Sequence, residues 1–370
     1  MRRLRIGVVG AGRRIRDTHL PVLRALESHF EIVGVWSRSR SSREALAKEI
    51  GVKAFPNIKS LVSDARIDAA LVSVSYQANG EIAIETSSFG IPMFLETPFA
   101  PNLVQAKELF DQIEKIQGLV EVGEQNPFKP QVEMMQRLLD TGVVGELQVA
   151  QSDLLSQGYH GISVARRHIG FDLQPLHLTS SQIPIRLAPY TDRFSGSPGE
   201  TKEILQTAAI QFESQRSATF QWTTLGWHTP ARWWKGFRIL TDRGMLMVHS
   251  INEEEPEFRI QVQQDGSNRA RSIIIDRELK NGVLRSLSAR WETDDSENPI
   301  VEWKNPIFEF QANAYNGKEW SDDFIGVARL WLGFYDSVNE GRPLLYGHQQ
   351  GMMDLRLHLA LAGENPEFSG

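Results

Sequence analysis

A Gly-Ala-Gly tripeptide at residues 10–12 is the feature of the sequence with the most specific chemical meaning. It follows the apolar run Leu4–Val9 and precedes leucines at helical spacing. In such a turn the first glycine permits the tight bend, the second lets the backbone approach a pyrophosphate, and the following helix N-terminus offers unpaired N–H groups. Ile15 stands where a third small residue is usual. The turn predicts a dinucleotide site with these cofactor-binding residues: Gly10, Ala11, Gly12, Arg13 and Arg14.

A second chemical signal lies at the end of the next predicted strand, Ile32–Trp36, where the chain continues Ser37-Arg38-Ser39-Arg40. NAD-binding domains usually place an acid here to hold the ribose 2′-hydroxyl, whereas an arginine beside a hydroxyl suits a 2′-phosphate. Ser37 and Arg38 therefore favour NADP(H) as the cofactor. NAD(H) stays possible, because these arginines could instead be solvated surface charges. Ser75, directly after a third predicted strand, is a further cofactor-binding residue.

The elements that must position these residues change character along the chain. From Leu4 to about Val122, short β-rich runs alternate with helical patterns, which is typical of βαβ units around a parallel sheet. Beyond Gln125 longer alternating strands are separated by Gly, Asp and Asn turns, which predicts a mostly antiparallel open sheet. We expect an α/β protein, with a doubly wound Rossmann sheet at residues 1–124 and a substrate-binding and oligomerisation α+β domain at 125–370. A cleft between the two is the expected binding site.

Individual elements follow from the same patterns. Ser41 and Ser42 supply an N-cap signal for one helix of the first domain. The other predicted helices are Asn102–Gln117, Gln131–Thr141, Asp322–Asn339 and His348–Ala362. The predicted strands are Leu4–Val9, Ile32–Trp36, Ala69–Val74, Pro92–Leu95, Leu119–Val122, Ile204–Phe212, Ala218–Thr224, Phe237–Leu240, Met245–Val248, Phe258–Gln263 and Arg271–Ile275.

The composition excludes several classes of function. Lys plus Arg number 40 against 46 Asp plus Glu, and the net charge of −6 lacks the basic excess of a nucleic-acid binder. Without cysteine there is no disulfide, thiolate metal site or Cys nucleophile. No apolar run approaches the roughly 18 residues that span a bilayer, and the stretch after Arg5 is too short for a signal peptide. We expect a cytoplasmic protein with no nucleic-acid or membrane partner and no metal.

Five motifs make the chain resemble the glucose-fructose oxidoreductase, inositol dehydrogenase and MocA (Gfo/Idh/MocA) family. They are Gly10-Ala11-Gly12, His19-Leu20-Pro21, the segment from Gly90-Ile91-Pro92 to Glu96-Thr97-Pro98-Phe99-Ala100, Gly142-Val143-Val144-Gly145-Glu146 and Thr241-Asp242-Arg243-Gly244-Met245-Leu246. The resemblance implies a Rossmann domain paired with an open-sheet domain that binds substrate and often forms oligomers. It also implies that Glu96, Thr97 and Asn79 lie at the nicotinamide end of the cofactor.

Several positions depart from the family pattern. Thr97 stands where the family has a lysine that assists proton transfer, and threonine is neither a cation nor a base near neutral pH. Asp172 and His177 match the family's Asp and His, but one extra residue lies between them. On a helix this extra residue would rotate one side chain relative to the other by about 100° from the family's arrangement. The resemblance leaves His177 as the best proton-relay candidate, with Asp172 and Thr97 as the other catalytic residues.

These observations support three hypotheses. The first is an NADP(H)-dependent oxidoreductase that transfers hydride to or from a small-molecule substrate. The second is a tetrapyrrole reductase like the cyanobacterial-type biliverdin reductases, which also lack the lysine; propionate-binding arginines would be Arg166, Arg167 and Arg186. The third is a catalytically silent nucleotide-binding sensor.

Further histidines and aromatic residues have competing interpretations. His160 and His168 flank Arg166 and Arg167 in a stretch that reads as a loop and are weaker catalytic candidates than His177. An aromatic group in the second domain could stack on a flat substrate, although the alternation of Phe220 and Trp222 favours a sheet face that mediates homo-oligomerisation. This group comprises Phe220, Trp222, Trp227, Trp233, Trp234 and Phe237.

Overall fold

The computed structural model describes residues 2–153, 158–192, 196–223, 235–249, 256–293, 298–310 and 321–363. The chain forms two compact units. The first contains Met1–Gln125 with two later segments, Pro306–Trp320 and Phe324–Leu355. The second contains the ranges Asn126–Asn305, Ser321–Asp323 and Arg356–Gly370. The first unit therefore draws on two segments from the C-terminal part of the sequence.

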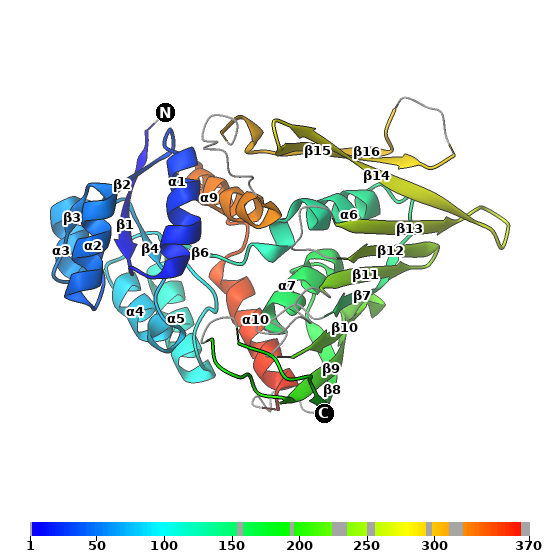
Figure 1. Cartoon of the computed structure of the whole chain (residues 1–370), viewed down its shortest axis with the longest axis horizontal. Helices are drawn as coiled ribbons and strands as arrows, with labels where there is room; N and C mark the ends of the chain where they lie inside the picture. Colours follow the sequence, from blue (N-terminus) through cyan, green and yellow to red (C-terminus); the bar gives the residue numbers. More distant parts are fainter. Residues whose placement is uncertain are drawn as a thin grey trace. The chain divides into compact units, whose positions relative to one another are not determined.

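The first unit is built on a six-stranded parallel sheet (Figure 1). Its order, β3-β2-β1-β4-β5-β6, is that of a doubly wound dinucleotide-binding sheet. The strands are mostly apolar because helices cover both faces of such a sheet. They are β1 (Leu4–Val9), β2 (Phe30–Trp36), β3 (Lys53–Ala54), β4 (Ala69–Val72), β5 (Met93–Leu95) and β6 (Val120–Val122). The described helices of this part of the chain are α1 (Leu20–Ala25), α2 (Arg40–Ile50), α3 (Ile58–Ala65), α4 (Asn79–Ser87) and α5 (Leu103–Ile116), with a π-helix at Ile15–His19 and a 3-10 turn at Tyr76–Ala78.

Local signals explain where these helices begin and end. The Asn102 side chain accepts from the Gln105 backbone N–H at the start of α5, and Gln117 ends the helix with φ of 51°. For α2 the predicted N-cap is wrong by a few residues. Ser39 is the capping residue, because its side chain accepts from the Ser42 N–H at 3.3 Å. Gly51, with φ of 74°, ends that helix.

The second unit is built on a ten-stranded, mostly antiparallel sheet of order β16-β15-β14-β13-β12-β11-β7-β10-β9-β8. Only the β7–β10 pairing is parallel among those described. The strands are β7 (Leu147–Asp153), β8 (Pro175–Arg186), β9 (Lys202–Phe212), β10 (Ser217–Trp222), β11 (Gly236–Thr241), β12 (Gly244–His249), β13 (Glu257–Gln263), β14 (Ala270–Lys280), β15 (Val283–Trp291) and β16 (Val301–Lys304).

The register of this sheet assigns each residue to one of two faces. Buried side chains form one row across it: Ile210, Ala218, Ala150, Ile239, Leu246 and Ile260. On this face α7 (Gly158–Ile169) packs against β7 and β10, and α6 (Pro130–Asp140) packs against β15 and β16. Residues one position along each strand point to the other face. The sheet is therefore covered on one face and open on the other over the described residues.

Two long helices end the described chain. They are α9 (Asp322–Glu340) and α10 (His348–Leu361), as the helical pattern predicts. The stretch from Gly158 to Ile169, which we read as a loop, is the helix α7, and β8 was not predicted at all. Both differences concern the elements that carry His160 and His177.

Candidate functional site

A pocket of about 510 Å³ lies at the carboxyl ends of β1, β2 and β4 in the first unit. This is the position at which doubly wound sheets bind ligands, where the order of strands reverses. Eight of the predicted cofactor-binding residues line it: Gly10, Ala11, Gly12, Arg13, Arg14, Ser37, Arg38 and Ser75. Its other lining residues were not predicted: Trp36, Ser39, Ser42, Ser73, Val74, Ala78 and Ile82.

The two glycines of the turn have different structural roles. Gly10 has φ of 129°, and a β-carbon there would lie 2.0 Å from the Ser73 carbonyl oxygen. Its own N–H donates to the Trp36 carbonyl at 2.7 Å, which ties the turn to the end of β2. A β-carbon on Gly12 would meet no described atom within 4 Å. Gly10 is thus required for folding the turn, whereas Gly12 leaves open space where a pyrophosphate could approach.

Ile15, where a third glycine is usual, is fully buried at the start of the π-helix Ile15–His19. A β-carbon on Gly10 would lie 3.1 Å from the Ile15 side chain, so the isoleucine packs beneath the turn. Wider helical turns of this kind occur often at functional sites. The isoleucine therefore fills the core below the pocket and leaves the turn itself open.

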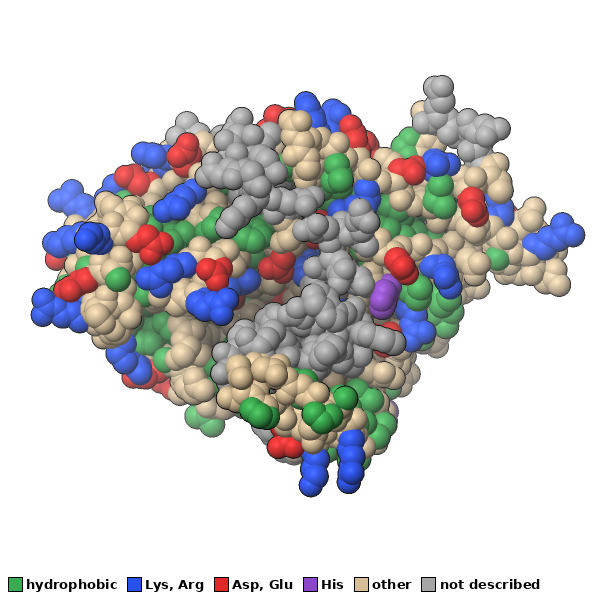
Figure 2. Space-filling model, viewed as in Figure 1, with side chains coloured by type: hydrophobic (Ala, Val, Ile, Leu, Met, Phe, Trp, Pro, Cys, Tyr) green, Lys and Arg blue, Asp and Glu red, His purple; other side chains and the backbone are tan. Residues whose placement is uncertain are grey.

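The end of β2 presents hydroxyl and guanidinium groups to the pocket. Ser37 is buried, and its carbonyl accepts from Arg43 Nη1 at 3.2 Å. Arg38 is about 70% exposed and reaches Glu81 on α4, with 3.4 Å between Nη2 and Oε2. On the face shown in Figure 2, Lys and Arg side chains are interspersed with Asp and Glu. This end of the pocket is therefore cationic, with Arg38 in its lining and the Arg43 guanidinium against the Ser37 carbonyl.

Glu96, at the end of β5, is a buried carboxylate with several partners. Its Oε1 accepts from Arg14 Nε at 2.7 Å and from His19 Nε2 at 2.7 Å. Its Oε2 accepts from the Thr97 backbone N–H at 3.1 Å. Trp331 Nε1 can only donate, so the His19 Nδ1 that it contacts at 3.1 Å must accept, and the imidazole is neutral with its proton on Nε2.

These contacts determine the charge of Glu96. Burial alone would raise the pKa of the Glu96 carboxyl, but the Arg14 guanidinium and the hydrogen bonds hold that pKa at about 2. Glu96 is therefore ionised at every physiological pH. Its oxygens are engaged by protein groups, so it acts as an anchor for Arg14 and for the backbone of Thr97.

Asn79 supports the same segment from α4. Its Nδ2 donates to the carbonyls of Glu96 and Pro98, and Thr97–Pro98 is a cis peptide. Its Oδ1 is buried and has no hydrogen-bond partner among the described residues. An acceptor left over beside the pocket, together with the open space at Gly12, fits a bound dinucleotide with hydroxyl or amide donors. Asn79, Glu96 and Thr97, the other three predicted cofactor-binding residues, are not among the residues that line the pocket.

Comparison with known proteins bears directly on this site. Residues 4–124 match the model of an oxidoreductase family with an NAD-binding Rossmann fold, GFO_IDH_MocA. Over these residues the chain is similar to the NAD-binding domain of the Gfo/Idh/MocA oxidoreductases, among them inositol 2-dehydrogenase and the rhizopine catabolism protein MocA. The resemblance inferred from the glycine turn and the segment around Glu96 is confirmed.

Relatives within this family match only part of the chain. An uncharacterized oxidoreductase of Schizosaccharomyces pombe is 28% identical over 157 residues, which is 41% of this chain and 42% of that protein. Inositol 2-dehydrogenase of Corynebacterium glutamicum is 26% identical over 159 residues, 42% of this chain and 45% of that protein. The chain therefore spans less than half the length of either relative in these matches.

A solved structure shares the whole fold. It is an oxidoreductase from Agrobacterium radiobacter in complex with NAD+, L-tartaric acid and magnesium. It is 13% identical, covers 99% of this chain and 97% of its own, and has a TM-score of 0.69. The predicted pairing of a Rossmann sheet with a large, mostly antiparallel sheet is confirmed, and this oxidoreductase shares the fold.

The residues that the family resemblance suggested in the second unit lie apart from its helices. Asp172 is exposed in the turn after α7, and His177 is exposed on β8, the outermost strand. His177 pairs with Gln211, in the row that contains the exposed Leu240 and Met245. The helical spacing argument does not apply, because His177 lies on a strand and its side chain faces away from α6 and α7.

Of two other histidines of the second unit, His168 is buried and His358 is half-buried. Burial and the nearby Arg167 lower the pKa of His168 to about 3, and its ring stacks on Phe237 with centroids 5.2 Å apart. Burial lowers the pKa of His358 to about 4. Both are therefore neutral near pH 7 and suit packing. His160, in the first turn of α7, is half-buried beside Tyr159, with ring centroids 4.4 Å apart.

The remaining candidates have structural surroundings. Arg166 is 1% exposed and donates to the Phe171 carbonyl, so it is not available to a propionate at the surface. Phe220, Trp222 and Phe237 are buried, which excludes them from an exposed stacking floor. The other three tryptophans of that group, Trp227, Trp233 and Trp234, lie outside the described residues. Within the described ranges no three His, Asp or Glu side chains are arranged to hold a metal ion, and no helix is both long and apolar enough for a bilayer.

Proposed function

We propose that this protein is an NADP(H)-dependent oxidoreductase that transfers hydride between the nicotinamide and a small-molecule substrate. The observation that carries the proposal is the composition of the pocket at the end of β2, where Trp36, Ser37, Arg38 and Ser39 line it and none is acidic. A related fold that binds NAD+ supports a nicotinamide cofactor. Bound NADP(H) would supply the hydride.

Each part of the pocket has a role in this proposal. The turn at Gly10–Gly12 and the helix N-terminus after it would hold the pyrophosphate. Ser37 and Arg38 would hold the 2′-phosphate through a hydroxyl and a charged fork. Thr97, whose backbone Glu96 fixes, would contact the nicotinamide end or the substrate.

Replacing Arg38 by glutamine is expected to weaken NADPH binding about tenfold. This is at the lower end of the effect of losing a hydrogen bond to a charged group, because the Arg38 side chain is well exposed to solvent. NADH binding should change by less than about twofold, since it has no 2′-phosphate. Fluorescence titration of the apoprotein measures both. Glu81→Gln is the matched control: it removes the competing anion 3.4 Å from Arg38 and should strengthen NADPH binding up to about threefold. Tighter binding of NADH than of NADPH by the unaltered protein would contradict the cofactor assignment.

The activity itself is tested by NADPH oxidation with a panel of sugars, aldehydes, imines and bilins. One productive acceptor supports the oxidoreductase. NADPH binding without oxidation across the panel would favour the catalytically silent alternative. Conversion of biliverdin alone would favour the tetrapyrrole reductase, although the burial of Arg166 does not support it.

We further propose that His160, rather than His177, is the proton relay. His160 is half-buried and lies on α7, which packs on the covered face of the sheet, whereas His177 lies on the open face. With a productive acceptor, His160→Gln should lower kcat by about 100-fold, the usual contribution of general acid catalysis, and His177→Gln should leave it unchanged. The reverse result would return the role to His177.

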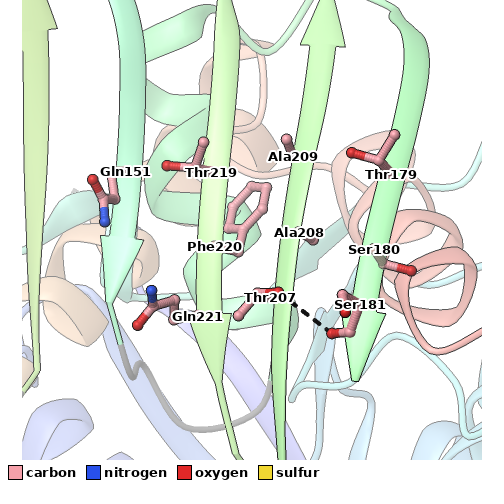
Figure 3. A pocket seen from close by; sticks show the side chains of 10 residues that line it. All are labelled: Gln151, Thr179, Ser180, Ser181, Thr207, Ala208, Ala209, Thr219, Phe220 and Gln221. Carbon is pink, nitrogen blue, oxygen red and sulfur yellow. Dashed lines mark hydrogen bonds between the residues drawn. The ribbon is translucent and has the colours of Figure 1, made fainter. Parts of the chain in front are cut away.

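A homo-oligomer is the proposed assembly, formed through the open sheet face. Figure 3 shows a pocket on β7, β8, β9 and β10 lined by uncharged residues, and Thr207 donates to the Ser181 carbonyl across it. In a dimer with two-fold symmetry, this face of one copy would contact the same face of the other copy. Because the pocket lining is uncharged, like charges would not meet there. The lining residues are Gln151, Thr179, Ser180, Ser181, Thr207, Ala208, Ala209, Thr219, Phe220 and Gln221.

An Ala209→Arg protein is expected to be monomeric at concentrations at which the unaltered protein is an oligomer, because two arginines would be buried face to face. Light scattering after size-exclusion chromatography measures the mass. Val104→Arg, which adds the same charge to α5 at a site 78% exposed, should leave the mass unchanged. If Ala209→Arg also kept the oligomeric mass, the contact would have to use another surface.

A further inference from the structure

Contacts around Glu96 connect the glycine turn to the segment that follows β5. Arg14 lines the pocket directly after the turn, and its Nε donates to Glu96 Oε1 at 2.7 Å. The other oxygen of the same carboxylate accepts from the Thr97 N–H at 3.1 Å. One carboxylate therefore joins Arg14, two residues after the glycine turn, to the backbone of Thr97, which is 83 positions later in the chain.

The carboxylate is held rigidly from its other side. His19 donates to Glu96 and accepts from Trp331, and both rings are fully buried. Trp331 stacks on Phe94 with centroids 4.2 Å apart and planes 7° apart. These groups have no freedom to reorient, whereas the Arg14 side chain is 33% exposed at the pocket. Arg14 is the member of this network that a ligand can reach.

Arg14 also contacts Gln125. Its Nη2 donates to Gln125 Oε1 at 3.1 Å, just beyond β6. The guanidinium thus spans groups that follow β1, β5 and β6, three strands of the same parallel sheet. A fork with donors fixed in one plane suits this bridging role, and a lysine ammonium would reproduce the charge without the geometry.

We infer that Arg14 is a positioning residue: through Glu96 it fixes the Thr97 segment relative to the glycine turn, so that binding of the nicotinamide half of the cofactor depends on it. This rests on the proposed function. Preorganised segments strengthen binding because the ordering entropy is already lost before the ligand arrives. Without Arg14, the Thr97 segment keeps Asn79 and His19 as indirect supports but loses its connection to the turn.

The test compares two ligands that differ only in the nicotinamide. NADPH and 2′-phospho-ADP-ribose are titrated calorimetrically into the unaltered protein and into Arg14→Gln. NADPH affinity should fall about tenfold in the variant and fragment affinity by less than about twofold, because loss of one charged hydrogen bond typically changes an equilibrium by this order. Arg14→Lys should restore part of the NADPH affinity, since charge is kept and the fork is lost.

Arg13→Gln is the matched control. Arg13 lines the same pocket, is 84% exposed and pairs with Asp17 without reaching Glu96. The Arg13→Gln substitution should change the affinities for NADPH and for 2′-phospho-ADP-ribose by equal factors. Thermal melting of each apoprotein shows whether it folds, and Arg14→Lys carries the comparison if Arg14→Gln does not.

The outcomes separate the hypotheses. Equal losses for both ligands in the Arg14 variants would make Arg14 a direct phosphate ligand and overturn the inference, as would unchanged affinity for both. Failure of the unaltered protein to bind either ligand would instead overturn the proposed function. A selective loss of NADPH affinity that Arg14→Lys partly restores supports the positioning role.

Discussion

A Gly10→Ala protein is expected to lose NADPH binding by at least about 100-fold and to have a less stable first unit, by about 3 kcal/mol or more. Two effects combine. An alanine at φ of 129° occupies a backbone region that side chains rarely adopt, and its β-carbon would lie 2.0 Å from the Ser73 carbonyl oxygen. Relief requires β1 and β4 to separate where their carboxyl ends form the pocket. Fluorescence titration with NADPH and a thermal melt of the apoprotein measure the two losses.

Gly12→Ala is the matched control for this substitution. Gly12 lies two residues away in the same turn, and an added β-carbon meets no described atom within 4 Å. The apoprotein should therefore be as stable as the unaltered one, or more stable by up to about 1 kcal/mol through the less flexible unfolded chain. NADPH binding should still weaken, because the methyl group occupies the space for the pyrophosphate. Equal stability of the Gly10→Ala and Gly12→Ala proteins would contradict the steric account.

The glycine turn could be predicted from the sequence because its signal is local. The apolar run of β1, the glycines and the helix after them lie within about 20 consecutive residues, and each constrains the backbone independently. The strands of the first sheet other than β3 (Lys53–Ala54) were predicted for the same reason. Buried parallel strands are short, uniformly apolar and separated by clear helices.

The network around Glu96 could not be predicted, because its members are distant in sequence. His19 and Arg14 lie 77 and 82 positions from Glu96, and Trp331 lies 312 positions from His19. No spacing rule links such residues. The one signal present was a histidine in the first helix together with a glutamate after β5, and only the fold shows that they meet.

The elements β8 and α7 were not predicted from the sequence, for a different reason. Most residues of β8 are exposed on both faces, so Pro175–Arg186 shows no alternation of apolar and polar residues that would mark a half-buried strand. In α7, Gly158 and Gly161 weaken the helical propensity, and packing of Ile162, Ala165 and Ile169 against the sheet outweighs it. His177 lies on β8 and His160 on α7, so the surroundings of both histidines could not be predicted from the sequence.

A Glu96→Gln protein is expected to be less stable at pH 7 by about 3 kcal/mol, the equivalent of lowering a carboxyl pKa from 4.5 to about 2. Glutamine keeps the shape of Glu96 but leaves the guanidinium of Arg14 without its anion. The group's folded pKa is depressed, so its contribution is complete above about pH 4.5 and is lost as pH falls toward 2. The difference in unfolding free energy between the two proteins should therefore be constant above about pH 5 and shrink below it. Urea titrations of the apoproteins from pH 3 to pH 8 measure this difference.

Glu121, a second fully buried glutamate of the first unit, provides the opposite case. Burial raises the pKa of the Glu121 carboxyl to about 8, although it accepts the N–H groups of Leu345 and Tyr346. Between about pH 4.5 and 8 the Glu121 carboxyl is therefore protonated in the folded state and ionised in the unfolded state. The unfolding free energy falls as the pH rises through that range. Between about pH 5 and 8, the unfolding free energy of the unaltered protein should fall relative to that of Glu121→Gln. Over the same pH range, its difference from Glu96→Gln should stay constant. If the two differences in unfolding free energy, one for Glu96→Gln and one for Glu121→Gln, varied with pH in the same way, the opposite pKa shifts of the two carboxyls would be contradicted.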